Sequence, residues 1–406
     1  MPSASQTGLF RNPFIRYILL SGMFLQIGIW VRNFAILLFV MEQTNNDPFA
    51  VSLISVAEFA PIFLFSFIGG TYADRWRPKR TMVWCDVLSA ISVFVVLLTL
   101  LFGSWKAVFL ATLVSAILSQ FSQPSAMKLF KQHVPEEQLQ AGMAMFQTLM
   151  AVFMIIGPVV GTFVYQSFGI HTAIAVMGVA FLLSAGALSF LPPDRRQERA
   201  ANTSVWEELV DGFRYVLAKP MLRTLGVVFA IAGIGVGLMQ PLGVFIVMER
   251  LGLPKENVQW LMMVYGSAML VGGGLVVHFA KKISPQKLLA IGMLANGISI
   301  SGIGLSTDLW LTLAFEFFCG LFFPCIHIGI NTLILQSSEA AFVGRVNGVL
   351  NPLFMGMLVA AMSMAGWLKG MFSLVIVFLI SGMLFLLGTL VLVPLFKHKP
   401  EPASET

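Results

Sequence analysis

Apolar residues form long blocks along almost the whole chain, and short polar segments separate these blocks. A helix needs about 20 such residues to cross about 30 Å of hydrocarbon, because it rises about 1.5 Å per residue. The pattern predicts an all-α integral membrane protein with no soluble domain. Its twelve spanning helices are expected at about residues 14–40, 49–72, 81–103, 107–130, 140–166, 171–191, 224–248, 258–280, 285–305, 309–335, 347–368 and 372–395.

The longest polar stretch, from Leu191 to Thr224, lies between the sixth and seventh blocks. Within it, Ser204 can cap an amphipathic helix along the membrane surface, whose apolar positions recur at helical spacing at Val205, Leu209, Phe213 and Val216. We therefore expect two six-helix bundles joined by a linker. The expected ranges are 1–191 and 224–396 for the bundles, 192–223 for the linker and 397–406 for a cytoplasmic tail.

The two halves of the chain resemble one another. Pro124 in the fourth block and Pro324 in the tenth block are 200 residues apart, and His278 follows the eighth block where Asp74 follows the second. Internal duplication with a central linker is typical of transporters that work by alternating access.

Charged residues make up only 11% of the chain, compared with about 25% in soluble proteins. Their positions indicate how the chain is oriented in the membrane. Of the 25 Lys and Arg residues, four lie in segments that would be outside if the N-terminus were inside: Lys106, Arg250, Lys255 and Lys369. Arg32 lies within a block, and the other twenty lie in the cytoplasmic segments. Both termini are therefore expected in the cytoplasm, and the formal charge of +6 indicates topology and not nucleic-acid binding.

The chain carries none of the patterns expected of an enzyme. It has no phosphate-binding G-x-x-x-x-G-K loop, no convincing nucleophile and base, and no metal-ligand cluster. Cys85, Cys319 and Cys325 all lie in apolar blocks and are expected to act as small hydrophobic residues. We expect neither enzymatic activity, nor a cofactor, nor a metal.

Three charged residues lie well inside the predicted spans. Arg32 and Glu58 lie at similar depth on consecutive helices, so we predict an ion pair or a shared hydrogen-bond network between them. The alternative is that Arg32 extends to the outer headgroups. Glu58 and Glu316 are both candidates for a proton carrier, because burial favours a protonated carboxyl and a nearby cation favours an ionised one. The alternative for each is a structural hydrogen bond.

Several other residues in the spans are candidates for a substrate cavity. His327 and Asn331 are four residues apart and so share one face of a helix, and His327 is either a proton relay or a structural donor. Polar amides in spans usually face protein or water, although the same residue types fill any membrane interior. The candidates are Asn33, Phe34, Gln147, Met239, Gln240, His327, Asn331 and Asn351.

Three motifs carry a likeness to a known family. The segment GGTYADRWRPKR, residues 69–80, resembles the loop signature of the major facilitator superfamily, and Gly157, Pro158 and Gly161 resemble its antiporter motif. FVGRVNGV, residues 342–349, is similar to the branch of macrolide efflux proteins and enterobactin exporters. Pro78 and Arg77 depart from the usual loop signature.

The resemblance implies roles for the loop signature and for the Gly-Pro motif. Asp74 and its basic neighbours would form a cytoplasmic latch in one state of the transporter, with residues Gly70, Asp74, Arg75, Lys79 and Arg80. Asp86, early in the third block, is expected near the inner surface, where it would join this cluster in either a gating or a structural role. The alternative is a cluster of charges that sets topology. The Gly-Pro motif would seal the pathway between the halves, or alternatively serve ordinary close packing.

The expected function is export of an amphipathic small molecule, multidrug-like or macrolide-like, in exchange for protons. The protein would act as a monomer in the inner (cell) membrane of a bacterium, with no nucleic-acid partner. One alternative is an exporter or flippase for a native siderophore or lipid-like metabolite. A second is a membrane receptor that does not transport.

Overall fold

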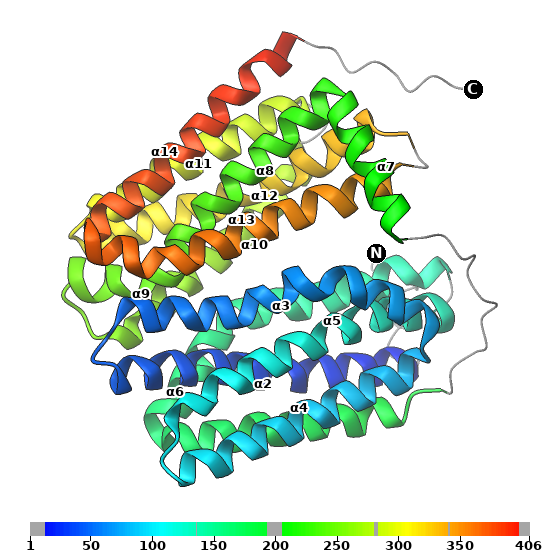
Figure 1. Ribbon diagram of the computed structural model, residues 1–406, viewed down its shortest axis with the longest axis vertical. Coiled ribbons are helices and arrows are strands. Elements are labelled where there is room, and N and C mark those ends of the chain that lie inside the picture. Colours follow the sequence, from blue (N-terminus) through cyan, green and yellow to red (C-terminus); the bar gives the residue numbers. More distant parts are fainter. Residues whose placement is uncertain (1–12, 135, 193–204, 280–282, 340–341, 398–406) are drawn as a thin grey trace, which may run out of the picture. The chain divides into compact units, whose positions relative to one another are not determined.

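The computed structural model describes residues 13–134, 136–192, 205–279, 283–339 and 342–397, and these residues form helices and connecting turns but no strand (Figure 1). The helices are α2 Pro13–Gln43, α3 Pro48–Arg75, α4 Pro78–Leu101, α5 Val108–His133, α6 Glu136–Ser189, α7 Val205–Ala218, α8 Pro220–Met239, α9 Gly243–Phe245, α10 Val258–Phe279, α11 Pro285–Leu305, α12 Leu309–Ser337, α13 Val343–Met371 and α14 Leu374–Leu392. Shorter helical turns are η1 Trp105–Ala107, η2 Gln240–Leu242, η3 Ile246–Arg250, η4 Lys255–Asn257 and η5 Val393–Lys397.

Within the described residues, 11 helical segments are long and apolar enough to cross a membrane. One of them, in α6, is long enough to cross twice, and Gly169 interrupts it with φ 74° and ψ −178°. Only glycine adopts such a conformation without strain, so it divides α6 into two spans. Counting both parts gives the twelve spans predicted from the sequence.

Proline marks where many of these helices begin. A proline at the first helical position loses no backbone hydrogen bond, because the N–H groups of the first turn have no partner within the helix. Helices α2, α3, α4, α8 and α11 all begin at such a residue, namely Pro13, Pro48, Pro78, Pro220 and Pro285.

The chain divides into two compact units, residues 1–46 with 57–201 and residues 47–56 with 202–406. The same helix pairings occur in both units. In the first, α2 packs on α6, and α4 packs on α5 and α6; in the second, α8 packs on α13, and α11 packs on α12 and α14. The fold is therefore an all-α membrane fold of two bundles that repeat one arrangement, as the internal duplication predicted.

The seventh span is irregular near its middle. It runs from Pro220 to Arg250, but α8 ends at Met239 and is followed by η2, the single turn of α9 and the π-helical turn η3. Pro241 lies in η2 and has no N–H to donate, which accounts for the break at this point.

The linker helix α7 packs against the start of α13 in the second unit. The Tyr215 ring stacks on Phe342 with a centroid separation of 4.2 Å, and Lys219 forms an ion pair of 3.3 Å with Glu339. These contacts connect the linker to the second unit. Phe213 on the same helix remains 55% exposed, as expected for a helix that lies at a membrane surface.

Two glycines of the antiporter-like motif lie where α6 contacts α2 in the first unit. A Cβ atom at Gly157 would lie 2.3 Å from the Trp30 ring, and one at Gly161 would lie 2.5 Å from the Trp30 carbonyl oxygen. In membranes, small residues of this kind let helix backbones approach closely. The second unit has comparable contacts from α8 to α13, at Gly233 and Gly237.

Replacing Gly161 by alanine tests this close approach. A methyl group there would meet backbone atoms of α2, which cannot rotate away, so we expect Gly161→Ala to destabilise the protein by about 1–3 kcal/mol. Gly186→Ala on the same helix is the matched control, because no atom lies within 4 Å of its added methyl group. Thermal unfolding in detergent measures both. Equal effects of the two substitutions would contradict the packing described here.

Candidate functional site

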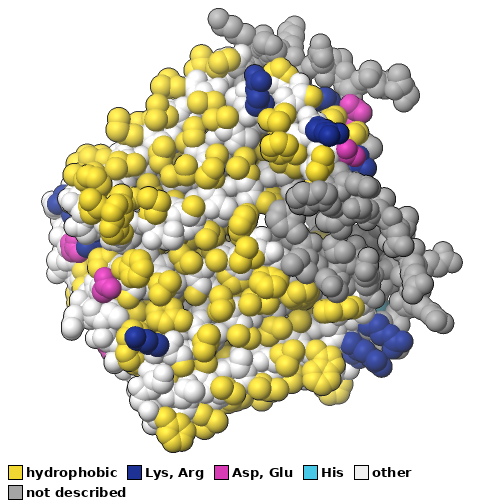
Figure 2. Space-filling view, in the orientation of Figure 1, with side chains coloured by type: hydrophobic (Ala, Val, Ile, Leu, Met, Phe, Trp, Pro, Cys, Tyr) yellow, Lys and Arg dark blue, Asp and Glu magenta, His cyan; other side chains and the backbone are white. Residues whose placement is uncertain are grey.

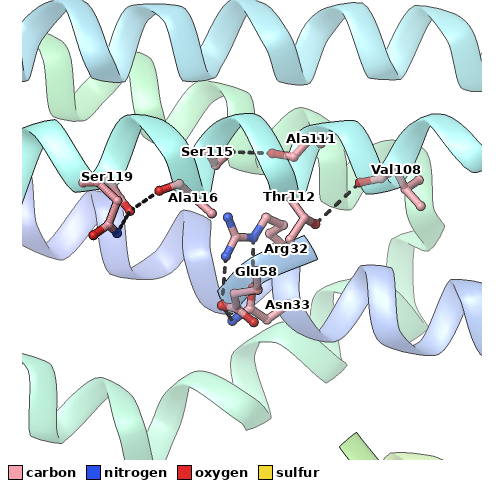
Figure 3. A network of polar contacts seen from close by, with 10 residues as sticks. Arg32, Asn33, Glu58, Val108, Ala111, Thr112, Ser115, Ala116 and Ser119 are labelled. Carbon is pink, nitrogen blue, oxygen red and sulfur yellow. Dashed lines mark hydrogen bonds and ion pairs between the residues drawn. The ribbon is translucent and has the colours of Figure 1, made fainter. Parts of the chain in front are cut away.

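Arg32, Asn33 and Glu58 form a polar cluster between α2 and α3 in the first unit (Figure 3). A guanidinium nitrogen of Arg32 lies 3.2 Å from Oε1 of Glu58. Asn33 completes the cluster, because its Oδ1 accepts from Nε of Arg32 at 2.9 Å and its Nδ2 donates to Glu58 at 3.1 Å. The ion pair predicted from the sequence is confirmed.

The burial of Arg32 explains why the pair is needed. The residue is only 4% exposed, and an arginine in the middle of a span costs at least about 2.5–3.5 kcal/mol unless a partner or water compensates it. Glu58 supplies the opposite charge, and its side chain keeps 26% of its surface exposed. The amide of Asn33, predicted to contact substrate, is engaged by both charged groups.

Glu316 has a different environment in α12 of the second unit. It is half-buried, and the structure gives its carboxylate no hydrogen bond or ion pair with any residue whose side chain is described. Tyr265 and Cys319 are close enough to interact with it electrostatically. Glu58 is thus held by a cation, whereas Glu316 is an unpaired carboxyl group inside a span.

Cys319 and its neighbours add a polar cluster that the sequence did not reveal. The Cys319 thiol donates to Oδ1 of Asn296 at 3.0 Å, and the Asn296 amide donates to the Gly292 carbonyl oxygen at 2.9 Å. These residues connect α11 with α12 one turn from Glu316. No sequence signal separated Asn296 or Tyr265 from other residues of these apolar helices.

The predicted substrate residues differ in exposure. Gln147 on α6 is exposed, as are four polar residues of the second unit: Gln240, His327, Asn331 and Asn351. Met239 is half-buried. Phe34 is only 2% exposed and packs against Gly161, so its side chain belongs to the α2–α6 contact.

The residues of the predicted latch fall into two groups. The backbone places Gly70, Asp74 and Arg75 in the last turns of α3, but the side chains of Asp74 and Arg75 lie outside the described part of the structure. Lys79, at the start of α4, donates to the carbonyl oxygens of Ser189 and Leu191 at 2.7 and 2.5 Å. A cation at this position stabilises the C-terminal end of α6, where carbonyl groups lack partners.

Asp86 lies in the interior of the first unit and is only 4% exposed. Its carboxylate accepts a hydrogen bond of 2.6 Å from Ser184 on α6, whose hydroxyl lies 2.8 Å from that of Ser21 on α2. The three side chains connect α4, α6 and α2. The sequence singled out Asp86 but not the two serines, since serine is common on any helix face.

No group of three or more His, Cys, Asp or Glu residues in the described part of the chain could hold a metal ion. Cys85, Cys319 and Cys325 are buried free thiols.

Substitutions of the Arg32–Glu58 pair test its contribution to stability. We expect Glu58→Gln to destabilise the protein by about 3 kcal/mol, because it leaves a buried guanidinium without its counter-ion. The double substitution Arg32→Met with Glu58→Met removes both charges and should recover most of this loss. Unfolding in detergent measures both variants. A double variant no more stable than Glu58→Gln would contradict the described pairing.

Known proteins match most of the chain. The model of the Major Facilitator Superfamily matches residues 18–253 and 225–406. An uncharacterized MFS-type transporter of Bacillus subtilis (strain 168), YkuC, is 26% identical over 360 residues, covering 86% of this chain and 83% of its own. Multidrug efflux pump Tap of Mycolicibacterium fortuitum is 26% identical over 77% of this chain and 78% of its own. Macrolide efflux protein A of Streptococcus pyogenes is 22% identical over 78% of this chain and 79% of its own.

Solved structures agree with the fold. The nucleoside transporter NupG superposes with a TM-score of 0.74 at 13% identity, over 96% of this chain and 100% of its own. A bacterial homolog of the lysosomal transporter Spinster, in an inward-facing and unoccupied conformation, gives a TM-score of 0.69 at 14% identity, over 96% of this chain and 100% of its own. The family match, the twelve spans and the repeated bundle show that this chain belongs to the major facilitator superfamily and is a multi-pass membrane transporter.

Proposed function

We propose that this transporter exports amphipathic small molecules in exchange for protons, by alternating access. The relatives named as a multidrug efflux pump and a macrolide efflux protein support export of such compounds. The Lys and Arg distribution supports cytoplasmic termini. The bacterial relatives support a location in the cell membrane of a bacterium, where a proton gradient is available. We propose that the protein works as a monomer.

The observation that carries proton exchange is the contrast between Glu316 and Glu58. A carboxyl group that exchanges protons must be stable when neutral and must lose its proton when water or a cation reaches it. Glu58 already has a cationic partner, because a guanidinium nitrogen of Arg32 lies 3.2 Å from its carboxylate. Glu316 has no such partner among the described side chains, so we assign it the exchanged proton, with Arg32 and Glu58 as a fixed pair in the first unit.

The exposed polar residues within the spans support a role in substrate binding. An amide or imidazole exposed on a spanning helix is costly against lipid, which favours a wet cavity for these side chains. We propose that Gln147, Gln240, His327, Asn331 and Asn351 line the route, with Met239 as an adaptable apolar contact. A carboxylate at Glu316 would favour cationic or neutral compounds over anions.

Transport of ethidium into proteoliposomes tests this proposal. Some protein molecules insert inside out, and for these the vesicle lumen corresponds to the cell exterior. An acidic lumen should therefore drive ethidium into the vesicle as protons leave it. With the membrane potential clamped, exchange of one proton for each substrate supports about ten-fold accumulation for each pH unit. We expect Glu316→Gln to bring accumulation down to the level found without a gradient.

Two matched variants make this test specific. Glu256→Gln removes a carboxylate in η4, the short turn before α10, and should keep the full pH dependence. Glu58→Gln should keep the pH dependence in whatever fraction of the protein folds. Accumulation by Glu316→Gln that still follows the gradient would overturn the assignment of the proton to Glu316. Accumulation by the wild type that ignores the gradient would overturn proton exchange itself.

The latch at the end of α3 has its own test. Loss of a hydrogen-bonded charge shifts an equilibrium by about 10- to 100-fold, so Asp74→Asn should slow ethidium transport by a factor in that range. His278→Asn, at the corresponding position of the second half, is the matched variant and should change the rate much less. Equal rates for the two variants would contradict a latch formed by Asp74.

A further inference from the structure

An open groove of about 560 Å³ lies where α4 begins in the first unit. The residues before α4, the first turns of α4 and the middle of α5 all contribute to it. Six of the side chains that line it carry the inference: Trp76, Arg77, Arg80, Trp84, Leu88 and Phe121. The Lys and Arg distribution assigns this end of α4 to the cytoplasmic side of the membrane.

Aromatic side chains form much of the groove. Trp76 stacks on Phe121 with a centroid separation of 5.8 Å and an interplanar angle of 25°. Trp76 and Trp84 remain 48% and 61% exposed, so both indoles are accessible from outside the protein. Tryptophan is enriched at the level of lipid headgroups, where its apolar ring and polar N–H both find a suitable environment.

The groove continues into an exposed apolar stripe along α4. The side chains of Leu88, Ile91, Val95, Leu98 and Leu101 are 45–64% exposed, and their spacing of three or four residues places them on one face. From Trp84 to Leu101 the helix rises about 25 Å, most of the thickness of the hydrocarbon layer. Such a face on a spanning helix is a lipid-facing surface.

Two arginines give the groove a positive charge. Arg77 and Arg80 are exposed, and within the described part of the structure no ion pair or side-chain hydrogen bond engages either guanidinium. Lys79, between them, differs because it binds the end of α6. Figure 2 shows Lys and Arg side chains gathered where α4 begins, beside a broad hydrophobic surface of the same unit. Arginine binds phosphate through parallel N–H groups.

We propose that this groove binds an anionic phospholipid from the cytoplasmic leaflet. The phosphate would lie between Arg77 and Arg80, the headgroup region against Trp76 and Trp84, and an acyl chain along the stripe that starts at Leu88. A free anion would leave the aromatic and apolar surfaces uncovered, and a zwitterionic lipid would bring no net negative charge to offset the two arginines. Charge and apolar surface together therefore favour a lipid with a net negative charge.

Quenching of tryptophan fluorescence by brominated lipids tests the proposal with the full-length protein. Vesicles of phosphatidylcholine would contain a small fraction of either brominated phosphatidylglycerol or brominated phosphatidylcholine. Each arginine near a membrane surface contributes about five-fold to binding of an anionic lipid, so we expect a preference of about 25-fold for phosphatidylglycerol. We expect Arg77→Gln with Arg80→Gln to remove most of it. The matched control, Arg223→Gln with Lys287→Gln, removes two exposed charges at the starts of α8 and α11 and should keep it.

Two further measurements do not depend on the arginine variant being stable. In the wild type, the preference for phosphatidylglycerol over phosphatidylcholine should fall steadily as salt is added, because it depends on charge. Brominated phosphatidylglycerol should quench the wild type more than brominated phosphatidylcholine does, and this difference is the excess quenching. In Trp76→Phe with Trp84→Phe, the excess quenching should fall sharply, because the indoles nearest to the bound lipid are absent. Full excess quenching in that variant would place the lipid elsewhere. A preference that survives in the arginine variant, or that ignores salt, would overturn the proposal.

Discussion

Water is absent from the hydrocarbon core, so a charge inside a span needs a partner or a wet cavity. Arg32 meets this requirement through Glu58 and Asn33, and the cluster uses all three side chains at once. In the proposed proton exchange, this pairing argues against Glu58 as the proton carrier. Glu316, in the other unit, lacks such a partner among the described residues and becomes the candidate.

The same lack of water makes close packing the main source of specificity between helices. Hydrophobic burial does not distinguish a lipid tail from a leucine, so contacts depend on shape and on a few hydrogen bonds. Gly161 lets α6 lie against the backbone of α2, and Ser184 connects Asp86 with Ser21 across three helices. Repetition of the helix pairings in both units shows that the duplicated sequence specifies one packing scheme twice.

Much of the fold was predictable because its signals are local. Span lengths follow from apolar blocks, helix starts follow from prolines such as Pro78 and Pro285, and the pairing of Arg32 with Glu58 follows from their similar depth. The surroundings of Glu316 were not predictable, because α10, α11 and α12 are apolar on most faces and their periodicity does not show which residues meet. Tyr265 and Asn296 therefore emerged only from the structure. The same holds for Lys79, whose partners lie more than 100 residues away.

We propose that Glu316 carries the exchangeable proton and that Glu58 stays paired with Arg32. Infrared spectroscopy of the protein in bilayers tests this directly, because a protonated carboxyl group absorbs separately from a carboxylate and from amides. As the pH is raised, a carboxyl band should disappear in the wild type and also in Asp86→Asn, which removes the other buried acid, the one bound by Ser184. That band should be missing at every pH in Glu316→Gln and unchanged in Glu58→Gln. The claim would be contradicted if the band persisted in Glu316→Gln or vanished in Glu58→Gln.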